Sequence, residues 1–587
     1  VAIWGDGNMS GQLGMGDKTT EADEPVRLAT INAKIRSQED GWEDGPAEIC
    51  AAGMHTLCVD GKGKVWSWGI NDNATLGRVT AGPDSDELES VPMPIEQQDN
   101  PTVDSKPVPG GAAFEHPFKA VRCYAGDSIS LAQDERGDVK AWGAFRDGQG
   151  LLGFNATTLR QWQPTAIGPL QKHSVVQIAC GDDHYLALTT TGHVLSAGVG
   201  AAGELGRRTF ARTSPTNLIP ERLTLKDLVL VGAGAFHSFA VDKDGEVYGW
   251  GNNTYRQTGV SESDGGAAMK LERPTRVEAL SPAHHGGARV VQIAGGAFHS
   301  VFLFSNGEVW TVGRADESEC GLPEDHAEMA AMRERRKAAQ VKQDEWKKRE
   351  RKEYFVDRDE AKEVEALGAD GKPMSLAEID AEVEQDAATE CPLPNNYVAT
   401  PQRVEFPLEP KTWDATKTQD DYDDEPALLT EQTRIVHVAS AGQHSIAVSA
   451  RGYVYTWGLG IMNQLGNGGE RDREPTPRRV LNGVLKGLRA IKAEAGGQHC
   501  LVVSVSRDWE DKKKARDEKR RVEAEEKEKA RKEKEEEEAK AAAEAAAAPA
   551  KEAGGEAEDV EMKDDVPAAA EEKGAEAEKK LEPVAEA

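Results

Sequence analysis

The sequence lacks the features that mark several large protein classes. Its seven cysteines are scattered and form no CxxC pair, which argues against a disulfide scaffold or a zinc ribbon and favours a reducing compartment. No stretch approaches the roughly 18 apolar residues that a membrane span needs, so we expect no membrane association. The start, Val1-Ala2-Ile3-Trp4, does not resemble a signal peptide. With 71 basic and 102 acidic residues, the chain does not resemble a protein that wraps nucleic acid with its whole surface.

Signatures of enzymes are missing as well. The sequence contains no HExxH and no GxSxG motif, and the Gly-Lys pairs at 61–62 and 371–372 lack the Ser or Thr of a phosphate-binding loop. Residues 198–203 formally match GxGxxG, but no helix is expected to follow them. The histidines are spread singly along the chain, without the spacing of metal ligands. We therefore expect no covalent chemistry, no cofactor and no metal.

Composition separates two charged segments from the rest of the chain. Of 59 glycines, two lie in 323–433 and three in 506–587. The first segment holds 16 basic and 29 acidic residues, and the second holds 19 and 28. Both are rich in Glu, Lys, Arg and Ala, which favours solvated helix or disorder. We predict an insertion at 323–433, helical or disordered, and a tail at 506–587, helical and then disordered. Basic clusters at 333–337 and 512–521 are candidate nuclear import signals, with a solvated charged helix as the alternative.

The glycine-rich remainder repeats one pattern: a Gly/Ala-x-x-His step, a turn glycine and then Trp-Gly. Residues 234–251 form the clearest copy. The His step falls at seven places: His55, Ile129, His184, His237, His299, His444 and His499. The Trp-Gly position also falls at seven places: Trp4, Trp68, Trp142, Ala197, Trp250, Val312 and Trp457. Apolar and polar residues alternate on both sides of each turn, which predicts about four strands per repeat, the content of a propeller blade.

The two ends of the repeat series predict a closed ring. Trp4 has no His step before it, and His499 has no Trp-Gly after it. Residues 1–14 would then complete the blade that begins at 491–505, which removes the exposed edges of an open array. The predicted fold is all-β: a seven-bladed β-propeller formed by 1–322 and 434–505 and closed by the N-terminal strand.

The repeat resembles that of the regulator of chromosome condensation family. The resemblance is carried by 51–58, 71–78, Ala125-Gly126-Asp127-Ser128 and 142–153. It implies a guanine nucleotide exchange factor that binds the small GTPase Ran on chromatin in the nucleus and promotes release of GDP. This role belongs to nucleocytoplasmic transport and mitosis. In that family a β-wedge inserts beside the phosphate-binding loop of the GTPase, and here it would consist of Phe145, Arg146, Asp147, Gly148, Gln149, Gly150, Leu151 and Leu152.

The resemblance also implies roles for four further residues. Asp127 and Asp183 match acidic positions that the family uses against the GTPase, and His299 and His499 match histidines important for turnover. Other interpretations stay open, because the aspartates can cap local turns and six of seven repeats carry the histidine, which suits a structural hydrogen-bonding group. Ile129 departs from the repeat, so the bonding of its blade must differ.

Contact with histones and the nucleosome is a second implied property. Relatives present an arginine from a loop between blades, and Arg208 or Arg212 in 207–213 would take that place, with a solvated loop as the alternative. Relatives contact DNA through a basic N-terminal tail, which this sequence does not contain. The alternative function is a non-catalytic propeller scaffold in chromatin or ubiquitin pathways, which would bind a partner without releasing nucleotide.

Overall fold

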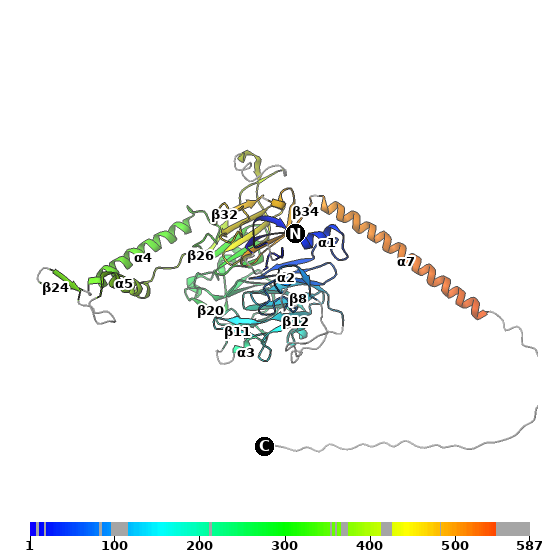
Figure 1. Ribbon diagram of the computed structural model, residues 1–587, viewed down its shortest axis with the longest axis horizontal. Helices are drawn as coiled ribbons and strands as arrows, with labels where there is room; N and C mark the ends of the chain where they lie inside the picture. Colours follow the sequence, from blue (N-terminus) through cyan, green and yellow to red (C-terminus); the bar gives the residue numbers. More distant parts are fainter. Residues whose placement is uncertain are drawn as a thin grey trace, which may run out of the picture. The chain divides into compact units, whose positions relative to one another are not determined.

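The repeated pattern folds as seven four-stranded antiparallel sheets, the blades of a propeller (Figure 1). The computed structural model describes residues 1–6, 11–16, 19–80, 85–95, 116–209, 214–352, 355–358, 361–364, 374–411, 425–481, 483–506 and 508–547. Blade 1 contains β3 (Glu48–Ala51), β4 (His55–Val59), β5 (Val65–Gly69) and β6 (Met93–Pro94). Blade 2 contains β7 (Ala120–Ala125), β8 (Ile129–Asp134), β9 (Val139–Gly143) and β12 (Gln161–Ala166). Blade 3 contains β13 (Val175–Cys180), β14 (His184–Thr189), β15 (Val194–Gly198) and β16 (Glu221–Arg222).

The other four blades have the same antiparallel order. Blade 4 contains β17 (Leu228–Ala233), β18 (His237–Asp242), β19 (Val247–Asn252) and β20 (Lys270–Arg276). Blade 5 contains β21 (Val290–Gly295), β22 (His299–Phe304), β23 (Val309–Arg314) and β26 (Tyr397–Val404). Blade 6 contains β29 (Ile435–Ala441), β30 (His444–Ser449), β31 (Val454–Leu459) and β32 (Arg473–Val480). Blade 7 contains β33 (Arg489–Ala495), β34 (His499–Val505), β1 (Ala2–Asp6) and β2 (Glu21–Arg27).

Helices and short hairpins lie outside the blades. The α-helices are α1 (Ala29–Arg36), α2 (Ser85–Glu89), α3 (Ser214–Asn217), α4 (Ala327–Arg351), α5 (Leu376–Glu390) and α7 (Trp509–Ala547). Short 3₁₀ turns lie at Leu170–Lys172, Glu262–Asp264, Glu278–Leu280, Pro282–His284, Pro426–Leu428 and Gly483–Leu485. Among the described residues, two-stranded hairpins pair β10 (Phe145–Asp147) with β11 (Gly150–Gly153), β24 (Phe355–Arg358) with β25 (Ala361–Val364), and β27 (Glu409–Pro410) with β28 (Leu429–Glu431).

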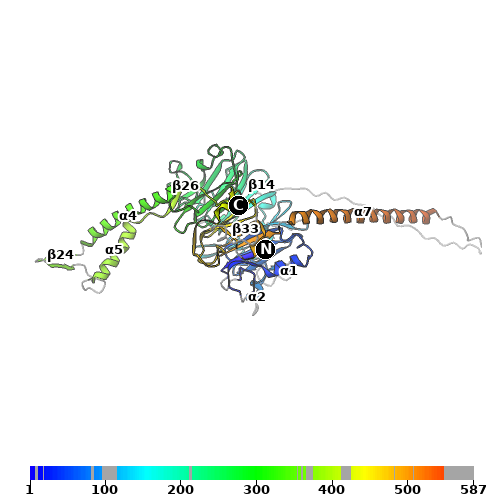
Figure 2. The same cartoon turned by 90° about the horizontal axis from the view of Figure 1, so that it is seen from above.

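The N-terminus closes the ring, which confirms the predicted closure. In β1, Ile3 lies opposite Leu501 and Trp4 lies opposite Cys500 of β34, and the N-terminus lies beside blade 7 in both views (Figures 1 and 2). The N-terminal contribution is larger than the predicted 1–14, because β2 also joins this blade and pairs with β1. Closure through backbone hydrogen bonds removes the unpaired edges of the first and last repeats.

The second strand of each blade is buried on both faces because neighbouring blades cover it. In β18 only the last residue, Asp242, is partly exposed. Asp242 begins the tight turn to β19, in which Gly245 has a φ of +90°, a conformation that side chains other than glycine rarely adopt. Five tryptophans of the repeat lie between neighbouring blades and are fully buried: Trp4, Trp68, Trp142, Trp250 and Trp457.

One polar bridge recurs between adjacent blades. Nε2 of His184 lies 2.8 Å from Oγ of Ser238 in the next blade, and that hydroxyl donates to the carbonyl of Glu204 at 2.8 Å. Since the hydroxyl proton is used there, the imidazole must donate to the hydroxyl. Burial lowers the pKa of His184 to about 3, so the ring is neutral at physiological pH. Five further bridges join His55 to Ser130, His237 to Ser300, His299 to Ser445, His444 to Cys500, and His499 to Thr56.

The charged insertion is smaller than predicted. Strand β26 lies inside the predicted 323–433, yet it pairs with β23 and completes blade 5. The chain therefore leaves the blade after β23 and returns at Tyr397. Between these points, α5 buries Ile379, Val383 and Ala387, and Gln343 of α4 donates to the carbonyl of Cys391 at 2.9 Å. The buried residues of β26 are three positions apart, at Val398, Pro401 and Val404, so the strand lacks the alternating pattern by which strands are recognised.

Residues 514–587 separate from the rest of the chain as a second unit. Within the described residues, no helix is both long and apolar enough to cross a membrane.

Candidate functional site

The loops that join the first and second strands of the blades surround one mouth of the central channel. The mouth is a cavity of about 310 Å³ lined mostly by glycine and alanine. Backbone hydrogen bonds link successive loops: Asp127 N–H donates to the carbonyl of Asp182 at 2.8 Å, and Asp182 N–H donates to that of Ala235 at 3.1 Å. Small residues are required here, because a Cβ on Gly126 would lie 2.4 Å from the carbonyl oxygen of Gly181. The loops therefore form a tight, rigid rim.

Acidic side chains gather on this rim at blades 2 and 3. Burial raises the pKa of Asp127, and burial together with the charge of Asp127 raises the pKa of Asp182 to about 7. Burial, together with the charges of Asp127 and Glu204, raises the pKa of Asp183 to about 6, against the lowering effect of its bond to Arg146. The structure thus brings the predicted Asp127 and Asp183 together and adds Asp182, which the sequence analysis did not single out.

The predicted wedge is the hairpin β10–β11, which stands outside the four-stranded sheet of its blade. Residues 146–149 are exposed, whereas Phe145 is 2% exposed. An added Cβ at Gly148 or Gly150 would meet no atom within 4 Å, so the tip projects into open space. The turn is closed by Asp147, whose Oδ1 accepts the N–H of Gln149 at 2.8 Å.

The hairpin is attached to the acidic rim at its base. The backbone N–H of Arg146 donates to Oδ1 of Asp183 at 2.8 Å. The guanidinium of Arg146 also lowers the pKa of both Asp127 and Asp183, in opposition to burial. Asp183 therefore positions the hairpin, and the exposed tip and the acidic rim form one continuous surface.

The hairpin begins at the one blade junction that lacks the polar bridge. At the junction of blades 2 and 3, Ile129 replaces the histidine and Tyr185 replaces the hydroxyl residue that would receive it. Ala197, paired with Tyr185 across the strands, replaces the tryptophan. Phe145 fills part of this space by stacking on Tyr185, with ring centroids 6.3 Å apart. Phe154, at the other end of the hairpin, belongs to the same apolar cluster.

His299 and His499, predicted to act in turnover, lie away from the surface. Both are 0% exposed, and each bridges to the next blade, His299 to Ser445 at 3.0 Å and His499 to Thr56 at 2.9 Å. Burial lowers the pKa of each to about 3. From these positions neither imidazole can touch a partner protein. Their burial and bridges favour the structural interpretation over the catalytic one.

Of the two predicted histone-contacting arginines, Arg208 is exposed and Arg212 lies outside the described residues. The neighbouring Arg207 turns inward, where it donates to the carbonyl of Asn217 at 3.1 Å and pairs with Glu221 at 2.9 Å. Arg207 therefore holds the base of the loop that presents Arg208.

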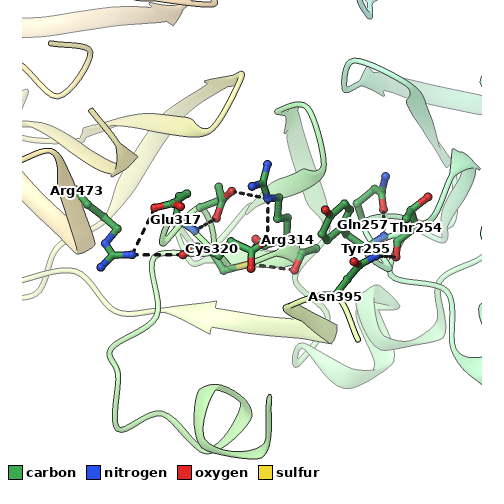
Figure 3. A network of polar contacts seen from close by, with 11 residues as sticks. Thr254, Tyr255, Gln257, Arg314, Glu317, Cys320, Asn395 and Arg473 are labelled. Carbon is green, nitrogen blue, oxygen red and sulfur yellow. Dashed lines mark hydrogen bonds and ion pairs between the residues drawn. The ribbon is translucent and has the colours of Figure 1, made fainter. Parts of the chain in front are cut away.

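Polar contacts also join the blades on the far side of the ring (Figure 3). Arg473 of blade 6 contacts Glu317 of blade 5, with Nη1 and Oε2 3.4 Å apart. Asn395 donates to the carbonyl of Thr254 in blade 4 at 3.5 Å. These contacts link blade 5 to the blades on either side of it.

The fold and the site define a closed seven-bladed propeller with a protruding hairpin and an acidic rim at one channel mouth. The RCC1-like domain family model matches residues 1–370, and the regulator of chromosome condensation (RCC1) repeat matches 451–503. The chain belongs to the RCC1 family.

Individual relatives agree with this assignment. The chain is 26% identical to Protein pim1 of Schizosaccharomyces pombe over 86% of this chain and 74% of that protein. It is 28% identical to guanine nucleotide exchange factor SRM1 of Saccharomyces cerevisiae over 88% and 90%. It also resembles the crystal structure of Prp20p from Saccharomyces cerevisiae, described with its binding properties to Gsp1p and histones, at 27% identity, a TM-score of 0.61, and coverage of 88% of this chain and 94% of that chain.

Proposed function

We propose that this protein is a guanine nucleotide exchange factor for the small GTPase Ran, acting on chromatin in the nucleus. The observation that carries the proposal is the exposed hairpin β10–β11, attached at Asp183 to the acidic rim of an RCC1-family propeller. The relative named as an exchange factor, SRM1, matches nearly the whole chain. A scaffold without exchange activity would have no need for a free hairpin held at a defined angle.

The proposed mechanism requires no covalent chemistry, because the GTPase holds its nucleotide only through non-covalent contacts. The hairpin inserts beside the phosphate-binding loop of Ran and displaces it. The factor must bind the nucleotide-free GTPase more tightly than the loaded form. By linkage, the factor by which it weakens nucleotide binding equals the factor by which nucleotide weakens its own binding. GTP replaces GDP because it is supplied in excess, not because the factor distinguishes the two.

Residues of the hairpin and of the acidic rim have different roles in the proposed mechanism. Arg146, Asp147, Gly148 and Gln149 form the inserting tip, and Gly150, Leu151 and Leu152 form the returning strand. Asp183 holds the base of the hairpin, and Asp127 and Asp182 supply negative charge beside it. An acidic rim attracts basic side chains of the GTPase and orients the encounter.

The test mixes the protein with Ran that carries fluorescent GDP, in the presence of excess GTP. We expect substoichiometric protein to accelerate release of the fluorescent nucleotide. Replacing 146–151 by two glycines should slow release at least a hundredfold. Asp183→Ala, which removes both the charge and the acceptor for Arg146 N–H, should slow it at least tenfold. Asp183→Asn keeps an acceptor oxygen and should slow it less than Asp183→Ala does.

The matched control is Asp244→Ala. Asp244 is exposed in the turn between β18 and β19, at the opposite end of the strand from the rim, and its loss should leave release unchanged. Stable binding of Ran without accelerated release would contradict the proposal and support the scaffold alternative.

We further propose that Arg208 contacts the acidic surface of histones in the nucleosome, together with Arg212. The support is the exposure of Arg208 on a loop held at its base by Arg207. Prp20p, which this chain resembles, is described with binding properties to histones. The histone contact and the hairpin come from different loops, so they are separable by mutation.

A further inference from the structure

The junction between blades 2 and 3 leaves an open apolar cavity of about 300 Å³. Aliphatic and aromatic side chains form most of its wall: Ile129, Phe145, Phe154, Ile167, Tyr185 and Leu218. None of these side chains carries a charge. The cavity opens to solvent beside Ala156 and Thr157, which line it and are exposed.

The cavity lies at a junction from which the tryptophan of the repeat is missing. At the preceding junction, a Cβ added to Gly77 would lie 2.9 Å from Nε1 of Trp142 and 3.0 Å from Cδ1 of Ile95. The indole there lies between the turn glycine of one blade and the apolar residue that follows its outer strand. At the junction of blades 2 and 3, Ala197 stands in the tryptophan position. Ile167, which follows β12 as Ile95 follows β6, lines the cavity instead of an indole.

The histidine bridge is absent from this junction too, so the space beside Ile129 and Tyr185 lacks the buried polar pair of the other junctions. Between blades 4 and 5 the tryptophan position is also lost, to Val312, but His237 still bridges to Ser300 there at 2.7 Å. Only the junction of blades 2 and 3 combines the loss of the bridge with the loss of the indole. The result is a cavity of about 300 Å³ with a mostly apolar wall.

We propose that this cavity binds an uncharged, planar aromatic compound of about the size of indole, and that its occupant controls the hairpin. An engineered apolar cavity of about 150 Å³ binds benzene, so this cavity of about 300 Å³ has room for a bicyclic ring. Tyr185 and Phe145 offer ring faces for stacking. The regulatory half of the proposal rests on the proposed exchange function, whereas the binding half does not.

The coupling to the hairpin follows from the position of two rings. Phe145 begins the hairpin and Phe154 follows its last strand, and both line the cavity. An aromatic occupant contacts both and fills the space into which either ring could rotate. It therefore holds the base of the hairpin in the inserting position, and exchange at limiting protein becomes faster.

Binding is tested with indole as the probe, by calorimetric titration of the full chain. We expect saturable binding of one indole per chain. Ala197→Trp restores the residue of the repeat and should weaken indole binding at least tenfold. Ala156→Trp places an indole at the exposed edge of the cavity, where folding is not at risk, and should have the same effect. Ala267→Trp, at an exposed alanine of blade 4, is the matched control and should bind indole like the wild type.

The outcomes separate the two proposals. No saturable binding by the wild type, or wild-type binding by Ala156→Trp, would overturn the cavity proposal. With binding established, saturating indole should raise the rate of nucleotide release at least twofold in the wild type and leave Ala156→Trp unchanged. An unchanged wild-type rate would refute the control of the hairpin. If the protein accelerates no release even without indole, the proposed exchange function fails while the binding result stands.

Discussion

Glu319 carries a buried carboxyl group at a turn position where glutamine makes the same hydrogen bond in two other blades. In the equivalent turns, Oε1 of Gln257 accepts the N–H of Tyr255 at 2.9 Å (Figure 3), and Oε1 of Gln464 accepts that of Met462 at 2.8 Å. Oε2 of Glu319 accepts the N–H of Glu317 at 2.8 Å in the same way. Its other oxygen, Oε1, makes no hydrogen bond. Glu319→Gln therefore keeps the turn and removes only the charge.

The size of the effect follows from the pKa of Glu319. Burial raises this pKa from 4.5 to about 7, although Nε of Arg314 lies 3.3 Å from Oε1 and opposes the shift. As pH rises from 4.5 to 7, the unfolded chain loses this proton while the folded protein keeps it. The unfolded state then binds fewer protons, so stability falls across this window. The total loss is about 3 kcal/mol, reached above pH 7.

We predict that Glu319→Gln raises stability by about 3 kcal/mol at pH 8 and changes it little at pH 4.5. For a folded unit of this size, that difference corresponds to a melting temperature higher by about 3 °C. Thermal unfolding followed by circular dichroism at several pH values between 4.5 and 8 measures it. The rate of nucleotide release should not change, because Glu319 is fully buried.

The reverse substitution provides the control. Gln257→Glu introduces a carboxyl group into the same kind of turn and should lower the melting temperature at pH 8 but not at pH 4.5. If Glu319→Gln and the wild type show parallel dependence of melting temperature on pH, then Glu319 is not the group that loses stability in this window, and the reasoning from its burial is refuted.

Two further predictions concern residues singled out by the sequence. His299→Ala and His499→Ala should each lower the free energy of unfolding by about 2–4 kcal/mol, since each removes a buried bridge and leaves a cavity. At low temperature, the rate of nucleotide release per folded molecule should stay within about threefold of the wild type, because neither ring reaches the surface. A hundredfold loss of rate in a variant that remains folded would support the catalytic interpretation instead. Arg208→Ala should weaken binding to nucleosomes several-fold in a mobility-shift assay at fixed salt while leaving exchange on free Ran unchanged, and equal loss of both would contradict separate contact surfaces.

The ring could be predicted from the sequence because each blade packs against its neighbours in the same way, so the same residue types recur in each repeat. A residue that recurs in six of seven blades, such as the histidine, meets a requirement that recurs in the fold. The recurring requirement is a buried hydrogen bond between adjacent blades, as from His184 to Ser238. A binding site for one partner needs a given residue only once in the ring. The recurrence of the histidine therefore indicated a structural role, and only the family resemblance suggested a catalytic role for His299 and His499.

Other features depend on contacts that a linear pattern does not contain. Strand β26 could not be predicted, because it lies between charged stretches and its three buried residues do not alternate with exposed ones. Asp182 joins the acidic rim only because the backbone of blade 2 bonds to that of blade 3. Phe154 becomes part of the site because the hairpin returns to the junction from which it started. Of these three features, only the acidic rim is indicated in the sequence, by the adjacent acidic residues Asp182 and Asp183.

The exceptions to the repeat point to the same place. Ile129, Tyr185 and Ala197 are up to 68 positions apart in the sequence, yet they meet at a single junction, and each substitution makes sense only beside the others. Without the histidine, a hydroxyl at 185 would lose its donor. Tyr185 and Phe145 stack in the space beside Ala197 and leave a cavity between the blades. The hairpin β10–β11 starts from this junction and uses Phe145 as its anchor. Six junctions keep the histidine bridge, and the seventh is rebuilt around the base of a protruding hairpin, so the departure from the repeat locates the proposed function.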